Sequence, residues 1–181
     1  MEKWMNQTVI KGLFFLAVCL LGQHAYAQQT PPSNPLDDVP EAMPFDIPYG
    51  TSINLEKANQ LLSAAVSEAK KRNWKLNIAV VDASGQLLAF NRMDGAQIAS
   101  IAISEHKARA AAQFRRETKA FENAIYLQKN NAPITIDGVI ASRGGIPLIE
   151  NGKLIGAIGC SGATGSQDEV ICKAAASLIN K

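Results

Sequence analysis

Histidine and cysteine are scarce in this chain of 181 residues, which holds two histidines and three cysteines. No Cys-x-x-Cys pair occurs, and two histidines cannot supply the several imidazoles of a histidine-rich catalytic zinc site. No serine lies in a Gly-x-Ser-x-Gly nucleophile elbow. Walker and Rossmann glycine patterns are absent as well. The sequence therefore disfavours zinc enzymes, serine hydrolases and nucleotide-binding proteins.

Charge of one sign is also lacking, because 18 basic and 16 acidic residues leave a formal net charge of +2. Aromatic residues make up only 6% of the chain, and no basic stripe occurs, so nucleic-acid binding is not expected. The N-terminal apolar run at 12–21 is about half the ~20 residues that a transmembrane helix needs. Lysines precede this run. Ala25-Tyr26-Ala27 follows it and has the small-x-small pattern of a signal peptidase cleavage site. Residues 1–27 are therefore predicted to be a signal peptide of a periplasmic or secreted protein, with no membrane attachment after cleavage.

Cleavage after residue 27 would remove Cys19 and His24. One histidine, His106, and two cysteines, Cys160 and Cys172, would remain. An oxidising compartment allows a disulfide between the two cysteines to persist. Two small buried thiols are the alternative, because free cysteine is usually buried.

Residues 28–53 hold six of the eight prolines and are predicted to form an extended arm. The arm is either a flexible linker or an ordered segment. In the second case Met43, Phe45, Ile47 and Tyr49 would dock it onto a neighbouring subunit. A single domain is predicted to occupy residues 54–181.

Apolar periodicity and turn signals predict four helices and five strands in this domain. The helices are expected at 54–72, 100–116, 118–127 and 168–178, and the last is expected to start with a Ser166/Glu169 capping box. The strands are expected at 76–82, 86–93, 134–142, 146–150 and 153–159. Asn151-Gly152 between the last two strands is a strong hairpin signal. The predicted fold class is α+β, an antiparallel five-stranded sheet flanked by helices in a profilin- or PAS-like sandwich.

The helix predicted at 100–116 has two separate apolar stripes, although a helix lying on a sheet needs only one. One stripe consists of Ile101, Ala108 and Ala112, and the other of Ile103, Ala110 and Phe114. We expect a partner subunit, a ligand or the following segment 118–127 to cover the second stripe.

Three stretches of the sequence resemble the GlcG/HbpS-like family of small haem-binding and related proteins. They read IAVVDASGQLLAFNRMDG (78–95), SIAISEHKARAAAQF (100–114) and GGIPLIENGKLIGAIGCSGATGSQDE (144–169). The chain is also similar to the C-terminal domain of PduO-type adenosyltransferases. The resemblance covers nearly the whole domain and implies an α/β sandwich that assembles into dimers or larger oligomers such as octamers. It also implies haem as the cofactor.

His106 is the candidate ligand for haem iron, because an imidazole beside small side chains leaves room for a flat macrocycle. A partly buried, hydrogen-bonded structural histidine is the alternative. Arg109 is a basic neighbour of His106. Met93 is a candidate soft ligand, or simply a residue that fills a gap in the core.

Arg143-Gly144-Gly145 and Ser161-Gly162 form a candidate anion site for a haem propionate or a small carboxylate. Consecutive glycines let backbone N–H groups face an anion, and Arg143 would bind a carboxylate through two hydrogen bonds. The alternative is that these glycines only form a bend and a strand-to-helix turn.

Two functions follow from these observations. The first is a periplasmic homo-oligomer that binds haem or a related tetrapyrrole. The alternative is an enzyme acting on a small carboxylate or aromatic catabolite. Arg143 would then bind the carboxylate, and Glu105 or His106 would be the general base.

Overall fold

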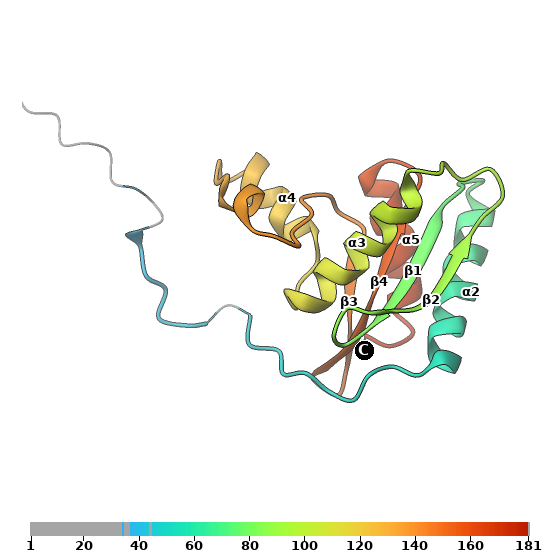
Figure 1. The fold of residues 1–181 in the computed structure, drawn as a ribbon, viewed down its shortest axis with the longest axis horizontal. Coiled ribbons are helices and arrows are strands. Elements are labelled where there is room, and N and C mark those ends of the chain that lie inside the picture. The colour runs from blue at the N-terminus through green and yellow to red at the C-terminus, as the bar shows by residue number, and fades with distance from the viewer. Residues whose placement is uncertain (1–33, 35–36, 44, 181) are drawn as a thin grey trace, which may run out of the picture. The chain divides into compact units, whose positions relative to one another are not determined.

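The computed structural model describes residue 34 and residues 37–43 and 45–180. The predicted signal peptide and the first residues of the predicted arm lie outside the described residues. The chain divides into two compact units between Ala42 and Met43, and the second unit holds all elements discussed below (Figure 1). Within the described part of the chain, no helix has the length and apolar character needed to cross a membrane.

The sheet has four antiparallel strands in the order β2-β1-β4-β3, so the expectation of five strands is wrong. The α+β class with an antiparallel sheet is confirmed. The strands are β1 (Asn77–Asp82), β2 (Leu87–Arg92), β3 (Gly145–Glu150) and β4 (Lys153–Ser161). Asn151 and Gly152 join β3 to β4 with φ of 51° and 73°, the positive values that a type I′ turn requires.

The strand expected at 134–142 does not form. A short 3-10 helix, η3 (Ala132–Thr135), is followed by a segment without regular structure. Pro133 lies in the first turn of η3, where its missing N–H costs nothing. Gly138 has a φ of 81°, which interrupts an extended chain. The apolar pattern was misleading because Ile134 and Ile136 are exposed.

Helices cover both faces of the sheet (Figure 1). Helices α2 (Leu55–Lys71) and α5 (Gly165–Ala176) pack on one face, and α3 (Ser100–Gln113) packs on the other. The fourth helix, α4 (Lys119–Tyr126), follows α3. Thr164 and Gln167 form the capping box of α5, so the Ser166/Glu169 box is wrong. That helix begins three residues earlier than the sequence pattern indicated.

Helix α3 lies close to the sheet because glycines of β3 and β4 face it. A Cβ atom added at Gly159 would lie 2.1 Å from the Ser104 carbonyl oxygen of α3. One added at Gly145 would lie 2.2 Å from the Lys107 carbonyl oxygen. Only a residue without a side chain allows the helix and strand backbones to meet at this distance.

A disulfide joins Cys160 of β4 to Cys172 of α5, with the two Cα atoms 5.7 Å apart. Both cysteines are fully buried in the cluster between the sheet and the pair α2 and α5. The bond therefore ties the last helix to a central strand.

The end of the predicted arm packs against its own domain. The Gly50 and Ile53 amides donate to the carbonyls of Leu154 and Ile155, so this segment runs beside the start of β4. The Tyr49 hydroxyl donates to the Gln113 carbonyl at the end of α3. This end of the arm therefore packs against its own domain.

Candidate functional site

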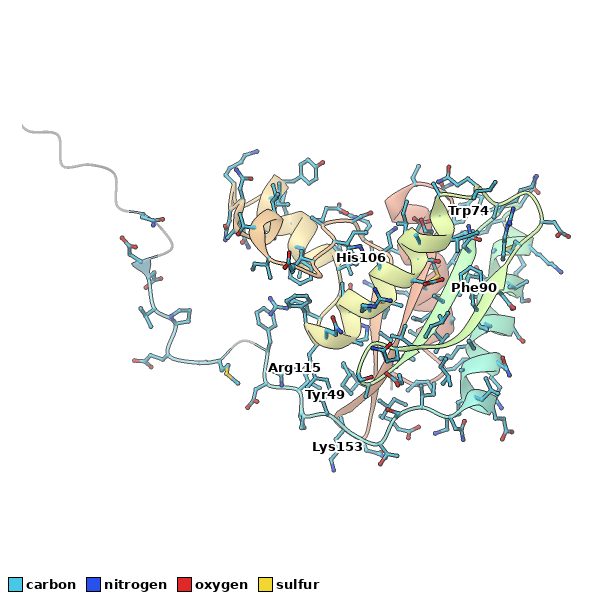
Figure 2. All side chains as sticks on the ribbon, in the orientation of Figure 1. Tyr49, Trp74, Phe90, His106, Arg115 and Lys153 are labelled. Carbon is cyan, nitrogen blue, oxygen red and sulfur yellow. A yellow bond between two sulfur atoms is a disulfide. The ribbon has the colours of Figure 1, made fainter. Side chains whose placement is uncertain are left out.

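His106 lies half-buried on the flank of α3 that faces away from the sheet, in the direction of α4 and η3 (Figure 2). Its Nε2 atom is 3.2 Å from the Gly138 carbonyl oxygen. A carbonyl only accepts hydrogen bonds, so Nε2 is the donor in this contact and Nδ1 is not engaged by it. The contact orients the imidazole while leaving one nitrogen available as a ligand.

The two apolar stripes of α3 have different surroundings. Ala108 and Ala112 of the first stripe are fully buried against the sheet. At the C-terminal end of the second stripe, Phe114 packs edge-to-face on Phe121 of α4, with ring centroids 5.3 Å apart. Ile103, near the start of the second stripe, is only half-buried. The following segment therefore covers only the C-terminal part of the second stripe, and the part around Ile103 and His106 stays accessible.

Arg143 is engaged by two carboxylates of the same chain. Its Nε donates to Glu122 at 2.7 Å, and its NH1 is 3.4 Å from Glu169. Lys119 and Lys173 complete this network around Glu169. Burial raises the pKa of Glu122, but the hydrogen bonds and charge of Arg143 outweigh burial, so the net shift is downward. An incoming carboxylate would have to displace Glu122.

The predicted glycine partners of Arg143 contact protein backbone. The Gly145 amide donates to the Thr118 hydroxyl, and the Gly144 carbonyl accepts from the Cys160 amide. Ser161 pairs with β1 in the sheet, and a Cβ added at Gly162 would lie 2.4 Å from the Lys75 carbonyl oxygen. These glycines therefore serve close packing of the backbone. The Gly145 amide already donates to Thr118 and is not free to bind an anion.

The remaining two candidates lie in different places. Met93 follows β2 and packs on the core beneath α2, the face of the sheet opposite α3. It lines a cavity of about 390 Å³ together with Trp74. Arg109 lies on α3, one turn after His106, and extends past Gly85 in the β1–β2 turn. The structure thus places Arg109 near His106 and separates Met93 from both.

Sequence reasoning missed a buried ion pair between Lys107 of α3 and Asp168 of α5. Both side chains are only 2% exposed, and Nζ lies 2.9 Å from Oδ2. Nζ also donates to the Cys160 carbonyl, and Oδ1 accepts from the Ala163 amide. Burial raises the pKa of Asp168, and Lys107 only partly offsets that shift. The available signal was helical spacing, because Lys107 shares a face with the sheet-facing Ala111.

Sequence reasoning also missed a cavity of about 540 Å³ at the end of α3. Its lining includes Phe114, Arg116 and Phe121, together with Phe45 from the arm. The Arg116 guanidinium lies over the Phe45 ring, 3.1 Å from its centroid. No cluster of three or more His, Cys, Asp or Glu side chains suited to a metal ion occurs among the residues that the structure describes.

The fold and the site define a small α+β protein with one accessible imidazole on a helix above an antiparallel sheet. A family model described as "Haem degrading protein HbpS-like" matches residues 53–177. The chain belongs to this HbpS-like family, which confirms the resemblance inferred from sequence. Protein GlcG of Escherichia coli K12 is 40% identical over 109 residues, which are 60% of this chain and 81% of GlcG.

Two solved structures are also similar. The crystal structure of HbpS has a TM-score of 0.67 and 29% sequence identity, covering 76% of this chain and 97% of HbpS. The crystal structure of a PduOC:heme complex has a TM-score of 0.66 and 27% identity, covering 72% of this chain and 96% of that chain.

Proposed function

We propose that this protein binds haem on the accessible flank of α3, with His106 as the residue that would hold the iron. The observation that carries the proposal is a half-exposed imidazole whose Nε2 is held by the Gly138 carbonyl. Metal-binding histidines commonly have one ring nitrogen oriented in this way. The family description and the PduOC:heme complex support the same ligand class.

The residues around His106 fit this cofactor. A haem brings four of the iron ligands itself, so one protein side chain is enough to hold the iron. Ile103 supplies a half-buried apolar contact one turn before His106, and Arg109 supplies a cation for a propionate one turn after it. When bound, haem would supply iron redox chemistry, and the protein's residues would position it.

We further propose that the protein is a periplasmic homo-oligomer, a dimer or a higher assembly such as an octamer. Tyr126, Leu127 and Ile134 are large side chains that are 68%, 74% and 69% exposed around α4 and η3. Clustered apolar exposure of this kind supports burial against another copy. The Cys160–Cys172 disulfide supports an oxidising compartment.

The enzyme hypothesis has weaker support. Its proposed carboxylate-binding residue, Arg143, already pairs with Glu122 and Glu169. A substrate carboxylate would therefore meet two negative charges at this position.

Haem titration of residues 28–181 tests the proposal. We expect the wild type to shift the Soret band, and His106→Ala to lose that shift or move it to a different wavelength. Glu105→Ala is the matched control, because it truncates the adjacent half-buried side chain on the same helix. An unchanged spectrum with wild type, or identical spectra for wild type and His106→Ala, would eliminate the iron-ligand role. Mass measurement in solution would test the oligomer separately.

A further inference from the structure

The cavity at the end of α3 is separate from the His106 flank and has its own chemistry. Its apolar walls come from α4, from η3 and from the residues that directly follow α3 and η3, and include Phe114, Phe121, Pro133 and Ile136. Phe45 of the arm forms a further wall. A volume of about 540 Å³ lies within the range of small-molecule sites, roughly 300–1,000 Å³.

Arg116 supplies the positive charge in this cavity. Its guanidinium contacts two aromatic rings, 3.1 Å from the Phe45 centroid and 5.2 Å from the Phe121 centroid. Its Nε donates to the Phe114 carbonyl at 3.1 Å. Among the residues that the structure describes, no carboxylate forms an ion pair with Arg116. Within the described residues, the NH1 and NH2 groups of Arg116 donate to no protein acceptor, so they are available to a ligand.

The electrostatic surroundings favour an anion at this position. Burial lowers the pKa of Arg116, and the adjacent Arg115 lowers it further by repulsion. Arg115 also lacks a carboxylate partner within the described residues, since its NH1 donates to the Ile47 carbonyl and its guanidinium lies over Tyr49. Glu117, the nearest acidic residue in sequence, pairs with Lys173. A ligand carboxylate would therefore neutralise a partly desolvated positive charge.

We propose that this cavity binds a small carboxylate that carries an aromatic ring. The carboxylate would accept two hydrogen bonds from Arg116, because guanidinium and carboxylate match in this two-pronged geometry. The ring would occupy the apolar part beside Phe114, Pro133 and Ile136. The cavity is distinct from the proposed haem site, since Gly138, whose carbonyl contacts His106, is not among the cavity's lining residues.

Calorimetric titration of residues 28–181 with three probes tests the proposal. Phenylacetate carries both the ring and the charge, phenylacetamide keeps the ring without the charge, and acetate keeps the charge without the ring. We expect phenylacetate to bind at least about tenfold more tightly than either of the others, because each lacks one of the two recognised groups. Equal binding of phenylacetate and phenylacetamide, or no binding of phenylacetate by the wild type, would overturn the proposal.

Two substitutions of Arg116 separate charge from geometry. Arg116→Gln removes both, and we expect affinity for phenylacetate to fall at least about tenfold. Arg116→Lys keeps the charge but loses the planar fork, so affinity should fall by a smaller factor. Arg92→Gln, a matched loss of an exposed arginine on β2, should leave affinity unchanged.

The outcomes distinguish this site from the haem site. If Arg116→Gln does not fold, as judged by circular dichroism, the lysine variant decides. If Arg116→Lys binds phenylacetate as tightly as the wild type does, the proposed pair of hydrogen bonds between guanidinium and carboxylate is overturned. Loss of haem binding in an Arg116 variant, combined with no phenylacetate binding by the wild type, would assign the guanidinium to haem and refute the separate site. Retained haem binding with lost phenylacetate binding supports the proposal.

Discussion

Replacing Lys107 with methionine removes the positive member of the ion pair buried between α3 and α5. Methionine keeps an unbranched side chain of similar length, so the change mainly deletes the charge. Asp168 would keep the hydrogen bond from the Ala163 amide and lose the ion pair with Lys107 at 2.9 Å. Because the carboxylate is 2% exposed, water cannot replace the lost ammonium group.

The expected loss of stability is about 3–5 kcal/mol, the usual effect of removing one partner from a buried pair. This is a large part of the roughly 5–15 kcal/mol that stabilises a typical domain. The melting temperature should fall by roughly 10 °C, given about 2–4 °C per kcal/mol in a domain of this size. The double variant Lys107→Met/Asp168→Asn leaves no buried charge, so it should be more stable than Lys107→Met by at least about 1 kcal/mol.

Urea unfolding followed by circular dichroism at pH 7, with the disulfide intact, measures these free energies. Lys70→Met is the matched control, since Lys70 is an exposed lysine on α2 and its loss should change stability by less than about 0.5 kcal/mol. The reasoning is refuted if Lys107→Met costs less than about 1 kcal/mol. It is also refuted if the double variant is as unstable as the sum of the two single variants.

Two further predictions concern close packing and pH. Gly159→Ala should destabilise the protein by about 3 kcal/mol or more, because the new methyl group would lie 2.1 Å from the Ser104 oxygen, and urea unfolding measures the loss. Glu122→Gln should flatten the fall of stability on acidification. The pKa of Glu122 lies below its ordinary value of 4.5, so its contribution is complete above that pH and is lost as the pH falls through the lowered value. Urea midpoints measured between about pH 6 and pH 3 record the slope.

A different result would contradict each of these two predictions. Gly152→Ala is the control for the first, because its site has a φ of 73° and open space around it, so only about 1–2 kcal/mol of backbone strain is expected. Similar losses at both glycines would show that close approach to α3 is not the cause. For the second, parallel pH curves for wild type and Glu122→Gln would show that Arg143 does not stabilise the ionised carboxylate.

Much of the fold was predictable because its signals are local. Asn151-Gly152 requires only its own backbone angles to form the hairpin, and Asn54 caps α2 through an amide three residues away. The segment 134–142 shows the limit of such signals. Its apolar residues suggested a strand, but the segment pairs with no strand of the sheet, and Ile134 stayed exposed.

The candidate site was predictable only in part. His106 was identifiable because it is the single histidine after the predicted cleavage. Arg143 was expected to meet a ligand carboxylate, but the structure pairs it with Glu122, 21 residues earlier in the chain. The cavity around Arg116 could not be predicted because its walls include Phe45, about 70 residues before the other lining residues in the chain.

The amino-acid sequence was sufficient to establish the family, the α+β fold class, the hairpin turn and the approximate positions of the helices. Each of these depends on neighbouring residues or on motifs shared with relatives. Tertiary structure alone decided which charges are neutralised and which stay available. Lys107 is buried on Asp168, whereas the adjacent His106 remains accessible. The physical reason is that a side chain's charge state and exposure depend on groups brought beside it from distant parts of the chain.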